Sequence, residues 1–216
     1  PGSPLGMHYY VRDVETDTTE LLSVTPAGTP GQPHGFNNGR MDVTPGGRFA
    51  VSGTDAADLV GTADTNSRTD GFLRDRQHGV TEWISLTEDG LQGNDSSLGP
   101  AISDDGRYVV FHSAATNLVP NDNNNEYDIF LYDRQLQQLR LVSAGLDGNP
   151  ANGQSFQVDI SGNGRYVVFR SSADNLVQED TSGDINVFRY DVQTGGLELV
   201  SRTPDGAKGE GWNPSI

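Results

Sequence analysis

The side chains best suited to chemistry in this sequence are acidic and amide residues that recur in three polar segments. Each segment begins with Asp, has Asn or Ser two residues later, and has Asp or Asn six residues after its start. The candidate ligands are Asp64, Asn66 and Asp70 in the first segment, Asp122, Asn124 and Asp128 in the second, and Asp180, Ser182, Asp184 and Asn186 in the third. Calcium takes about six to eight oxygen ligands, and alternate side chains of a tight loop supply them. The pattern therefore predicts that one or more of these segments bind Ca²⁺.

Turn formation is the alternative interpretation of the same residues. Asp and Asn side chains accept hydrogen bonds from nearby backbone N–H groups, which alone explains their recurrence in a loop between strands. The third segment, with oxygen-bearing side chains at its first, third and fifth positions, is closest to known calcium loops. The first segment has Arg68 at its fifth position, where a positive charge opposes a metal ion. Both interpretations stay open.

Catalytic patterns are weak by comparison. The four histidines are His8, His34, His78 and His112, and none belongs to an HExxH pair. The sequence also lacks the GxSxG motif of a nucleophile elbow. Carboxylates are abundant, but sequence alone does not pair a general acid with a general base. No catalytic residue is therefore assigned.

The elements that position these segments come from an internal repeat. A Gly-Arg pair begins at Gly47, Gly106 and Gly164, so that successive copies are 59 and 58 residues apart. Three further landmarks keep the same register: Asp58–Val60, Asn117–Val119 and Asn175–Val177; Phe72–Asp75, Phe130–Asp133 and Phe188–Asp191; and Asp89-Gly90, Asp147-Gly148 and Asp205-Gly206. Four landmarks in three copies indicate a repeat architecture.

Each copy predicts four short strands. In the middle copy these are Pro100–Ser103, Tyr108–His112, Asp128–Asp133 and Leu139–Ser143. The second strand carries apolar side chains on both of its faces, as expected where a strand packs between two neighbouring sheets. The predicted fold is all-β, a β-propeller of four-stranded antiparallel blades. A β-sandwich is the alternative, but it requires no such period.

The repeat sets the expected boundaries. Blades are expected at about residues 7–26 (partial), 40–88, 98–146, 156–204 and 212–216 (partial), which gives three full repeats of about 58 residues with partial blades at both ends. Open blade edges favour association, so self-association or a further propeller chain is expected to complete the ring. Residues 1–6 resemble an expression remnant.

Composition limits the partners. The formal net charge is −16, which opposes binding to nucleic acid phosphates. The sequence has no cysteine, so disulfides and thiol chemistry are excluded. No apolar run approaches the length of a membrane helix, and no membrane insertion is expected. Short, dense apolar runs separated by polar turns indicate that the chain is a folded β protein and not a disordered one.

The phrase Ser103-Asp-Asp-Gly-Arg-Tyr-Val-Val-Phe111, followed by Asn117-Leu-Val119 and Asp128-Ile-Phe-Leu-Tyr-Asp133, resembles the WD40-like repeats called PD40. These repeats occur in the propeller of TolB-type periplasmic proteins and in many exported bacterial proteins. The resemblance covers residues 7–216. It implies a propeller, an extracytoplasmic location in a bacterium (periplasmic, secreted or on the cell surface), and binding of partners at a propeller face. TolB repeats are shorter, so the cell-envelope role of TolB is not carried over.

Departures from the repeat suggest where a partner binds. The segment Pro26–Arg40 is about four residues longer than its counterparts. Trp83 lies on the predicted fourth strand of a blade. Trp212 lies near the predicted first strand of the partial blade at the C-terminus. An exposed Trp is suited to a glycan or protein contact, whereas a Trp packed between blades is structural.

These features favour a non-catalytic exported β-propeller that acts as a protein- or glycan-binding or scaffold module, stabilised by calcium if the polar segments bind it. The alternative function is a polysaccharide-active lyase or hydrolase with its site in the propeller funnel. The first strands that line the funnel offer Asp42, Asp159 and little other charge, which favours binding. A structural segment of a longer surface protein is a third hypothesis.

Overall fold

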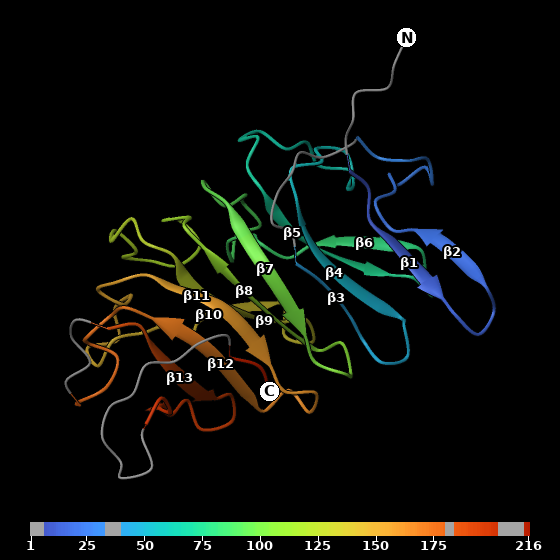
Figure 1. Cartoon of the computed structure of the whole chain (residues 1–216). Helices are drawn as coiled ribbons and strands as arrows, with labels where there is room; N and C mark the ends of the chain where they lie inside the picture. The colour runs from blue at the N-terminus through green and yellow to red at the C-terminus, as the bar shows by residue number, and fades with distance from the viewer. Residues whose placement is uncertain (1–6, 33–39, 180–183, 203–213) are drawn as a thin grey trace.

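The computed structural model describes residues 7–32, 40–179, 184–202 and 214–216. Within these residues the chain forms β-strands in four antiparallel sheets and contains no membrane-spanning helix. Figure 1 shows the sheets following one another along the chain, from β1 and β2 at one end to β11–β13 at the other. The predicted all-β fold with four-stranded antiparallel sheets is confirmed.

The strands fall into one two-stranded and three four-stranded sheets. The N-terminal half-blade consists of β1 (Tyr10–Asp13) and β2 (Thr18–Leu21). Blade 1 consists of β3 (Met41–Val43), β4 (Phe49–Thr54), β5 (Asp70–Asp75) and β6 (Val80–Trp83). Blade 2 consists of β7 (Ser97–Ile102), β8 (Tyr108–Ser113), β9 (Asp128–Asp133) and β10 (Gln138–Leu141). Blade 3 consists of β11 (Ser155–Ile160), β12 (Tyr166–Ser171), β13 (Asn186–Asp191) and β14 (Leu197–Leu199).

The observed strands differ from the predicted ones mainly at the first strand of a blade. β7 begins three residues earlier than the predicted Pro100–Ser103, and β11 begins three residues earlier than Val158–Ser161, the predicted first strand of the third copy. The additional residues pair across a shift in register, beside which Gly99 and Gln157 have φ angles of 59° and 53°. A bulge of this kind lets a strand continue after an extra residue. The third strand of blade 2, in contrast, has the predicted bounds.

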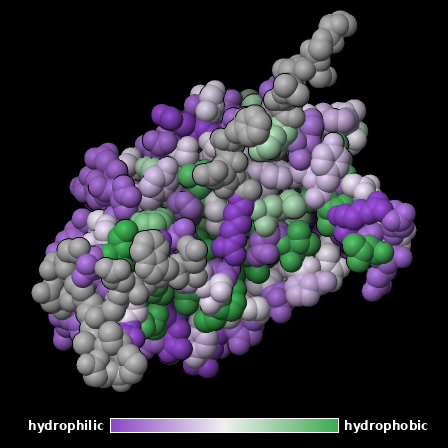
Figure 2. All heavy atoms as spheres, viewed as in Figure 1, coloured by the Kyte–Doolittle hydropathy of each residue, from purple (hydrophilic) through white to green (hydrophobic). Residues whose placement is uncertain are grey.

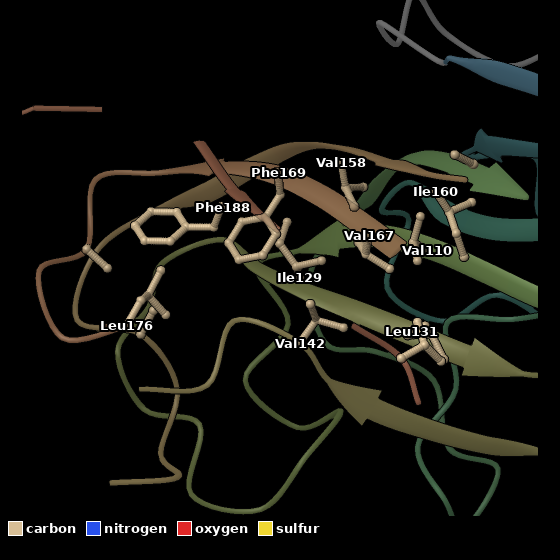
Figure 3. Close-up of a cluster of buried hydrophobic side chains, with 14 of the residues drawn as sticks. Val110, Ile129, Leu131, Val142, Val158, Ile160, Val167, Phe169, Leu176 and Phe188 are labelled. Carbon is tan, nitrogen blue, oxygen red and sulfur yellow. The ribbon is translucent and has the colours of Figure 1, made fainter. Parts of the chain in front are cut away.

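The hydrophobic core lies between successive blades. Val110 of β8 belongs to a cluster that includes Val158 and Ile160 of blade 3, whereas Val109 and Phe111 belong to a cluster shared with blade 1. Figure 3 shows the first cluster, in which side chains of blades 2 and 3 fill the space between their sheets. The two apolar faces predicted for this strand are therefore both buried. Removal of these side chains from water is the main favourable contribution to blade packing.

Charged pairs join neighbouring blades beside this core. Arg76 Nη2 lies 2.7 Å from Glu20 Oε2, and Arg134 Nη2 lies 2.6 Å from Glu82 Oε1. At the corresponding place between blades 2 and 3, the residue after β13 is Val192, which is buried. The third interface therefore uses an apolar contact where the first two use an ion pair.

Candidate functional site

The first polar segment lies in the linker between β4 and β5, and hydrogen-bond donors of the protein itself hold this first linker together. The second and third linkers contain the corresponding polar segments of blades 2 and 3. Asp64 Oδ1 accepts hydrogen bonds from the backbone N of Asn66 at 2.9 Å and of Ser67 at 3.2 Å. It also accepts one from the side-chain amide of Gln92, whose Nε2 lies 3.3 Å from Asp70 Oδ2. Turn formation, one of the two interpretations of the sequence, accounts for the two backbone bonds. The bonds of Gln92 come from a residue outside the linker.

Acidic or amide side chains at the start of each third strand pair with a serine that follows the fourth strand. The serine Oγ donates to Asp70 Oδ1 from Ser85 at 2.9 Å, to Asp128 Oδ1 from Ser143 at 2.5 Å, and to Asn186 Oδ1 from Ser201 at 3.2 Å. Each hydroxyl also accepts a backbone N–H from the residue after its partner. These contacts join the start of the third strand to the residues that directly follow the fourth strand of the same blade. The serines recur every 58 residues, so the repeat in the sequence contained a signal for them.

Burial makes two of these carboxylates hard to ionise. Desolvation raises the pKa of Asp70 to about 6 and the pKa of Asp128 to about 6. Hydrogen bonds from the serines and nearby amides act in the opposite direction without cancelling the effect of burial. The two linkers therefore hold carboxylates in an environment that favours either protonation or a compensating positive charge.

The second linker, between β8 and β9, contains a buried carboxylate oxygen without a hydrogen-bond partner in the described part of the chain. Asp122 is 7% exposed, and its Oδ1 has no hydrogen-bond partner among the described residues. Burial raises the pKa of Asp122. Asn124 Nδ2 donates to Asp128 Oδ2 at 2.7 Å and to the backbone O of Ala151 at 2.8 Å. The two linkers therefore differ at their first aspartate. Asp64 Oδ1 accepts hydrogen bonds, whereas Asp122 Oδ1 has no partner among the described residues.

The third linker is described only in part. Asp180 and Ser182 lie outside the described residues, whereas Asn186 Nδ2 donates to the backbone O of Asp184 at 3.2 Å. In the residues that the structure does describe, no three His, Cys, Asp or Glu side chains gather into a group that could hold a metal. A cation at these linkers would therefore need backbone carbonyls and water in addition to carboxylates.

The histidines lie in separate parts of the fold. His8 Nδ1 contacts a serine hydroxyl of the half-blade at 3.1 Å, and His78 Nδ1 lies 2.9 Å from Asp75 Oδ2 in a hairpin of blade 1. His112 is on β8, with its ring 5.4 Å from that of Tyr127. His34 lies outside the described residues. The fold does not bring His8, His78 and His112 to one place.

The two aspartates of the first strands hold blades together. Asp42 Oδ2 accepts from the backbone N of Ile102 in blade 2 at 3.0 Å. Asp159 Oδ1 accepts from Arg40 Nη2 in the chain leading into blade 1 at 2.9 Å. Each carboxylate therefore has a structural partner on another blade.

A surface groove runs along the fourth strands of blades 1 and 2. It consists of three adjoining cavities of roughly 420, 150 and 580 Å³. The first two share Trp83, Leu86 and Gly90, and the last two share Thr87, Glu88 and Leu139, so we call these cavities together the Trp83 groove. Their lining also includes Leu91, Gln92, Asp89, Asn121 and Gln138.

Trp83 is positioned by its own blade and still lines the groove. Its Nε1 donates to Ser85 Oγ at 3.0 Å, and its ring lies 5.3 Å from that of Phe72. The indole is partly exposed. Trp212 and residues 33–39 of the long segment lie outside the described residues. Figure 2 shows that hydrophilic residues dominate the visible face, with smaller hydrophobic areas between them.

No protein family model matches the chain, and no curated protein matches it. Solved structures do match. TolB from Acinetobacter baumannii is 16% identical with a TM-score of 0.50, over 88% of this chain and 36% of TolB. The protein described as TolB from Agrobacterium tumefaciens is 15% identical with a TM-score of 0.55, over 91% of this chain and 55% of that protein. The β-propeller domain of the Trilobed protease from Pyrococcus furiosus is 12% identical with a TM-score of 0.50, over 74% of this chain and 41% of that one.

The chain therefore spans little more than a third to about half the length of these matched structures. At such low identity the likeness concerns the fold. The four-stranded sheets, their order along the chain and these neighbours together identify a β-propeller fold, similar to that of the TolB structures.

Proposed function

We propose that this chain is a non-catalytic, exported propeller module that binds a protein partner through the Trp83 groove. The observation that carries the proposal is the groove itself, a concave surface of mixed polarity with an ordered aromatic side chain. Binding sites are typically concave, with apolar walls and a few polar groups that set orientation. Trp is also the residue type most enriched among the energetically dominant contacts of interfaces.

Order in the groove favours binding. The indole of Trp83 is held by Ser85 and Phe72 before any partner arrives, so little side-chain freedom is lost on association. Leu91, which is 63% exposed, adds an apolar contact beside it. Amide side chains such as Gln138 supply hydrogen-bonding groups at the other end.

Charge favours a basic protein partner over a neutral glycan. Glu88 and Asp89 line the groove, and the chain as a whole carries a formal charge of −16. A surface of this sign attracts and orients basic partners and repels acidic ones. A glycan is the competing ligand because Trp and amide side chains also suit sugars.

Catalysis has less support than binding in the described residues. Asp42 and Asp159, the carboxylates on the first strands, are engaged in contacts between blades. The proposal of export rests on the PD40-like sequence pattern and on the likeness to TolB structures.

The test is a binding measurement with a matched pair of leucine variants. Leu91 lines the groove and is 63% exposed, whereas Leu146 is 62% exposed and does not line it. Lys- and Arg-rich peptides and neutral oligosaccharides would be immobilised as separate panels. We expect basic peptides to bind, with a tenfold or larger loss of affinity for Leu91→Ala and Trp83→Ala and no loss for Leu146→Ala.

Equal affinities of all variants would place any binding outside the groove and overturn this site. Binding of oligosaccharides alone, lost in the same two variants, would assign the groove to a glycan. Absence of binding to both panels would contradict the proposed function.

Self-association is a second part of the proposal, carried by the N-terminal half-blade. Val14 is 84% exposed, whereas Val192, which follows β13 as Val14 follows β1, is buried against blade 2. We propose that a second copy covers the half-blade. The molar mass in solution should then rise with concentration, and Val14→Asp should abolish the rise; a constant monomer mass would contradict it.

A further inference from the structure

One position of the repeat decides whether a single side chain donates to both carboxylates of a linker. In blade 1 this position holds Gln92, whose Nε2 donates to Asp64 and lies 3.3 Å from Asp70 Oδ2. A single amide nitrogen therefore stands between the two carboxylates of the first linker.

Blade 2 has a proline at the equivalent position. The isolated bridge between Leu86 and Gln92 recurs in blade 2 between Ala144 and Pro150, which fixes the correspondence. Proline has no side-chain donor and no backbone N–H. Asp122, the counterpart of Asp64, has an Oδ1 with no partner among the described residues, although the residue is only 7% exposed.

The carboxylates of the second linker also act on each other. The negative charge of Asp122 contributes to the raised pKa of Asp128, which burial brings to about 6. Two desolvated carboxylates at one place are costly unless a donor or a cation compensates them. In blade 1 the amide of Gln92 reaches both carboxylates. In blade 2 Ser143 and Asn124 donate to Asp128, and Asp122 Oδ1 is left without a donor among the described residues.

The third repeat has a different residue type at this position. The residue 58 positions after Pro150 is Lys208, a cationic side chain, although it lies outside the described residues. An amide, a proline and an ammonium group thus occupy this position in the three repeats. At this position the proline of the second repeat offers no side-chain donor to the linker.

We propose that the second linker binds Ca²⁺, with Asp122 and Asp128 as its two carboxylate ligands and backbone carbonyls and water completing the shell. The cation takes the place that the Gln92 amide has in blade 1. Calcium suits the site better than magnesium, because it accepts six to eight oxygens in irregular geometry and dehydrates readily. With only two carboxylates we expect weak affinity, on the order of 10⁻⁴–10⁻³ M, as in extracellular calcium modules.

The test is thermal unfolding and titration calorimetry of the full chain with CaCl₂, with MgCl₂ as the control salt. Wild type should show binding heat and a rise in Tm of several degrees at 10 mM calcium, and no such rise with magnesium. Asp122→Asn should lose both responses. Asp64→Asn, the matched change in the first linker, should keep them.

Pro150→Gln gives an independent check because it introduces the donor that blade 1 already has. This variant should be more stable than wild type without calcium and should no longer respond to it. If wild type shows no calcium-specific heat or shift, or if Asp122→Asn or Pro150→Gln responds like wild type, the proposal is wrong. Peptide or glycan binding at the Trp83 groove is measured separately, so failure of one proposal does not decide the other.

Discussion

Arg40 and Asp159 join the first and third blades, with Arg40 Nη2 2.9 Å from Asp159 Oδ1. Arg40 Nη1 also donates to the backbone O of Val158 at 2.9 Å. The other oxygen of Asp159 accepts from the backbone N of Ile216 at 3.3 Å, just as Asp42 accepts from Ile102 at the preceding interface. Residues 214–216 therefore lie beside blade 3 in the way that β7 lies beside blade 1.

Asp159→Ala tests the energetic value of this junction. The change removes the acceptor of both Arg40 and Ile216, and we expect a loss of about 1–2 kcal/mol in the free energy of unfolding, since half-exposed charged hydrogen bonds are worth roughly that much. Urea unfolding measures it. Blade 2 has Ala101 at the corresponding place, so alanine itself is compatible with the strand. An unchanged midpoint would show that the junction adds no stability.

Gly106 and Gly90 have similar backbone conformations but different surroundings. Both have positive φ, 72° and 75°, which a residue with a Cβ adopts only at a cost. A Cβ on Gly106 would also collide with the ring of Phe49, which is buried beneath Arg48 and Arg134 and has little room to move. A Cβ on Gly90 meets nothing within 4 Å.

We therefore expect Gly90→Ala to cost about 1 kcal/mol of unfolding free energy and Gly106→Ala about 2–4 kcal/mol, because only the second adds a clash between blades. Thermal or urea unfolding of the two variants gives the comparison. Equal losses would mean that the backbone conformation alone sets the cost and that the contact with Phe49 relaxes freely.

The repeat made most of the fold predictable. Each blade's second and third strands are dense apolar runs next to a Gly turn, so local pattern and tertiary position agree there. The early start of β11 was not predictable, because its bulge depends on a left-handed conformation at Gln157 that this residue type does not signal. In β7 the same conformation is at Gly99, a residue type that favours it.

The candidate sites were predictable to a smaller degree. The spacing of Asp64, Asp122 and their partners located the linkers correctly on the chain. The role of Gln92 was hidden because it lies 28 residues from Asp64 and meets it only through the fold. The Trp83 groove likewise depends on how two blades pack, which alternation of residue types does not specify.

The pH dependence of stability tests how strongly desolvation acts on His112. Its ring lies between Tyr127 and Gly99, where a Cβ on the glycine would meet the imidazole Cε1 at 2.8 Å. Desolvation lowers the pKa of His112 from 6.5 to about 4. Its Nδ1 has no hydrogen-bond partner in the part of the chain that is described.

The sign of the effect follows from proton binding. Below pH 6.5 the unfolded chain takes up a proton at this histidine while the folded protein does not, so the folded state loses stability as the pH falls toward 4. Asp70 and Asp128 act in the opposite direction, because their pKa values of about 6 let the folded protein bind protons more readily than the unfolded chain does. The pH dependence of wild type alone is therefore a sum of opposing contributions.

The difference between wild type and His112→Gln isolates the histidine, since both proteins retain the two aspartates. Between pH 7 and pH 5 we expect wild type to lose about 2 kcal/mol more unfolding free energy than the variant, measured by urea titration at each pH. Above pH 7 the difference between them should stay constant, because His112 is neutral in both states there. Parallel curves from pH 7 to 5 would instead mean that the imidazole of His112 takes up its proton in the folded protein, through water or a rotated ring, as readily as in the unfolded chain.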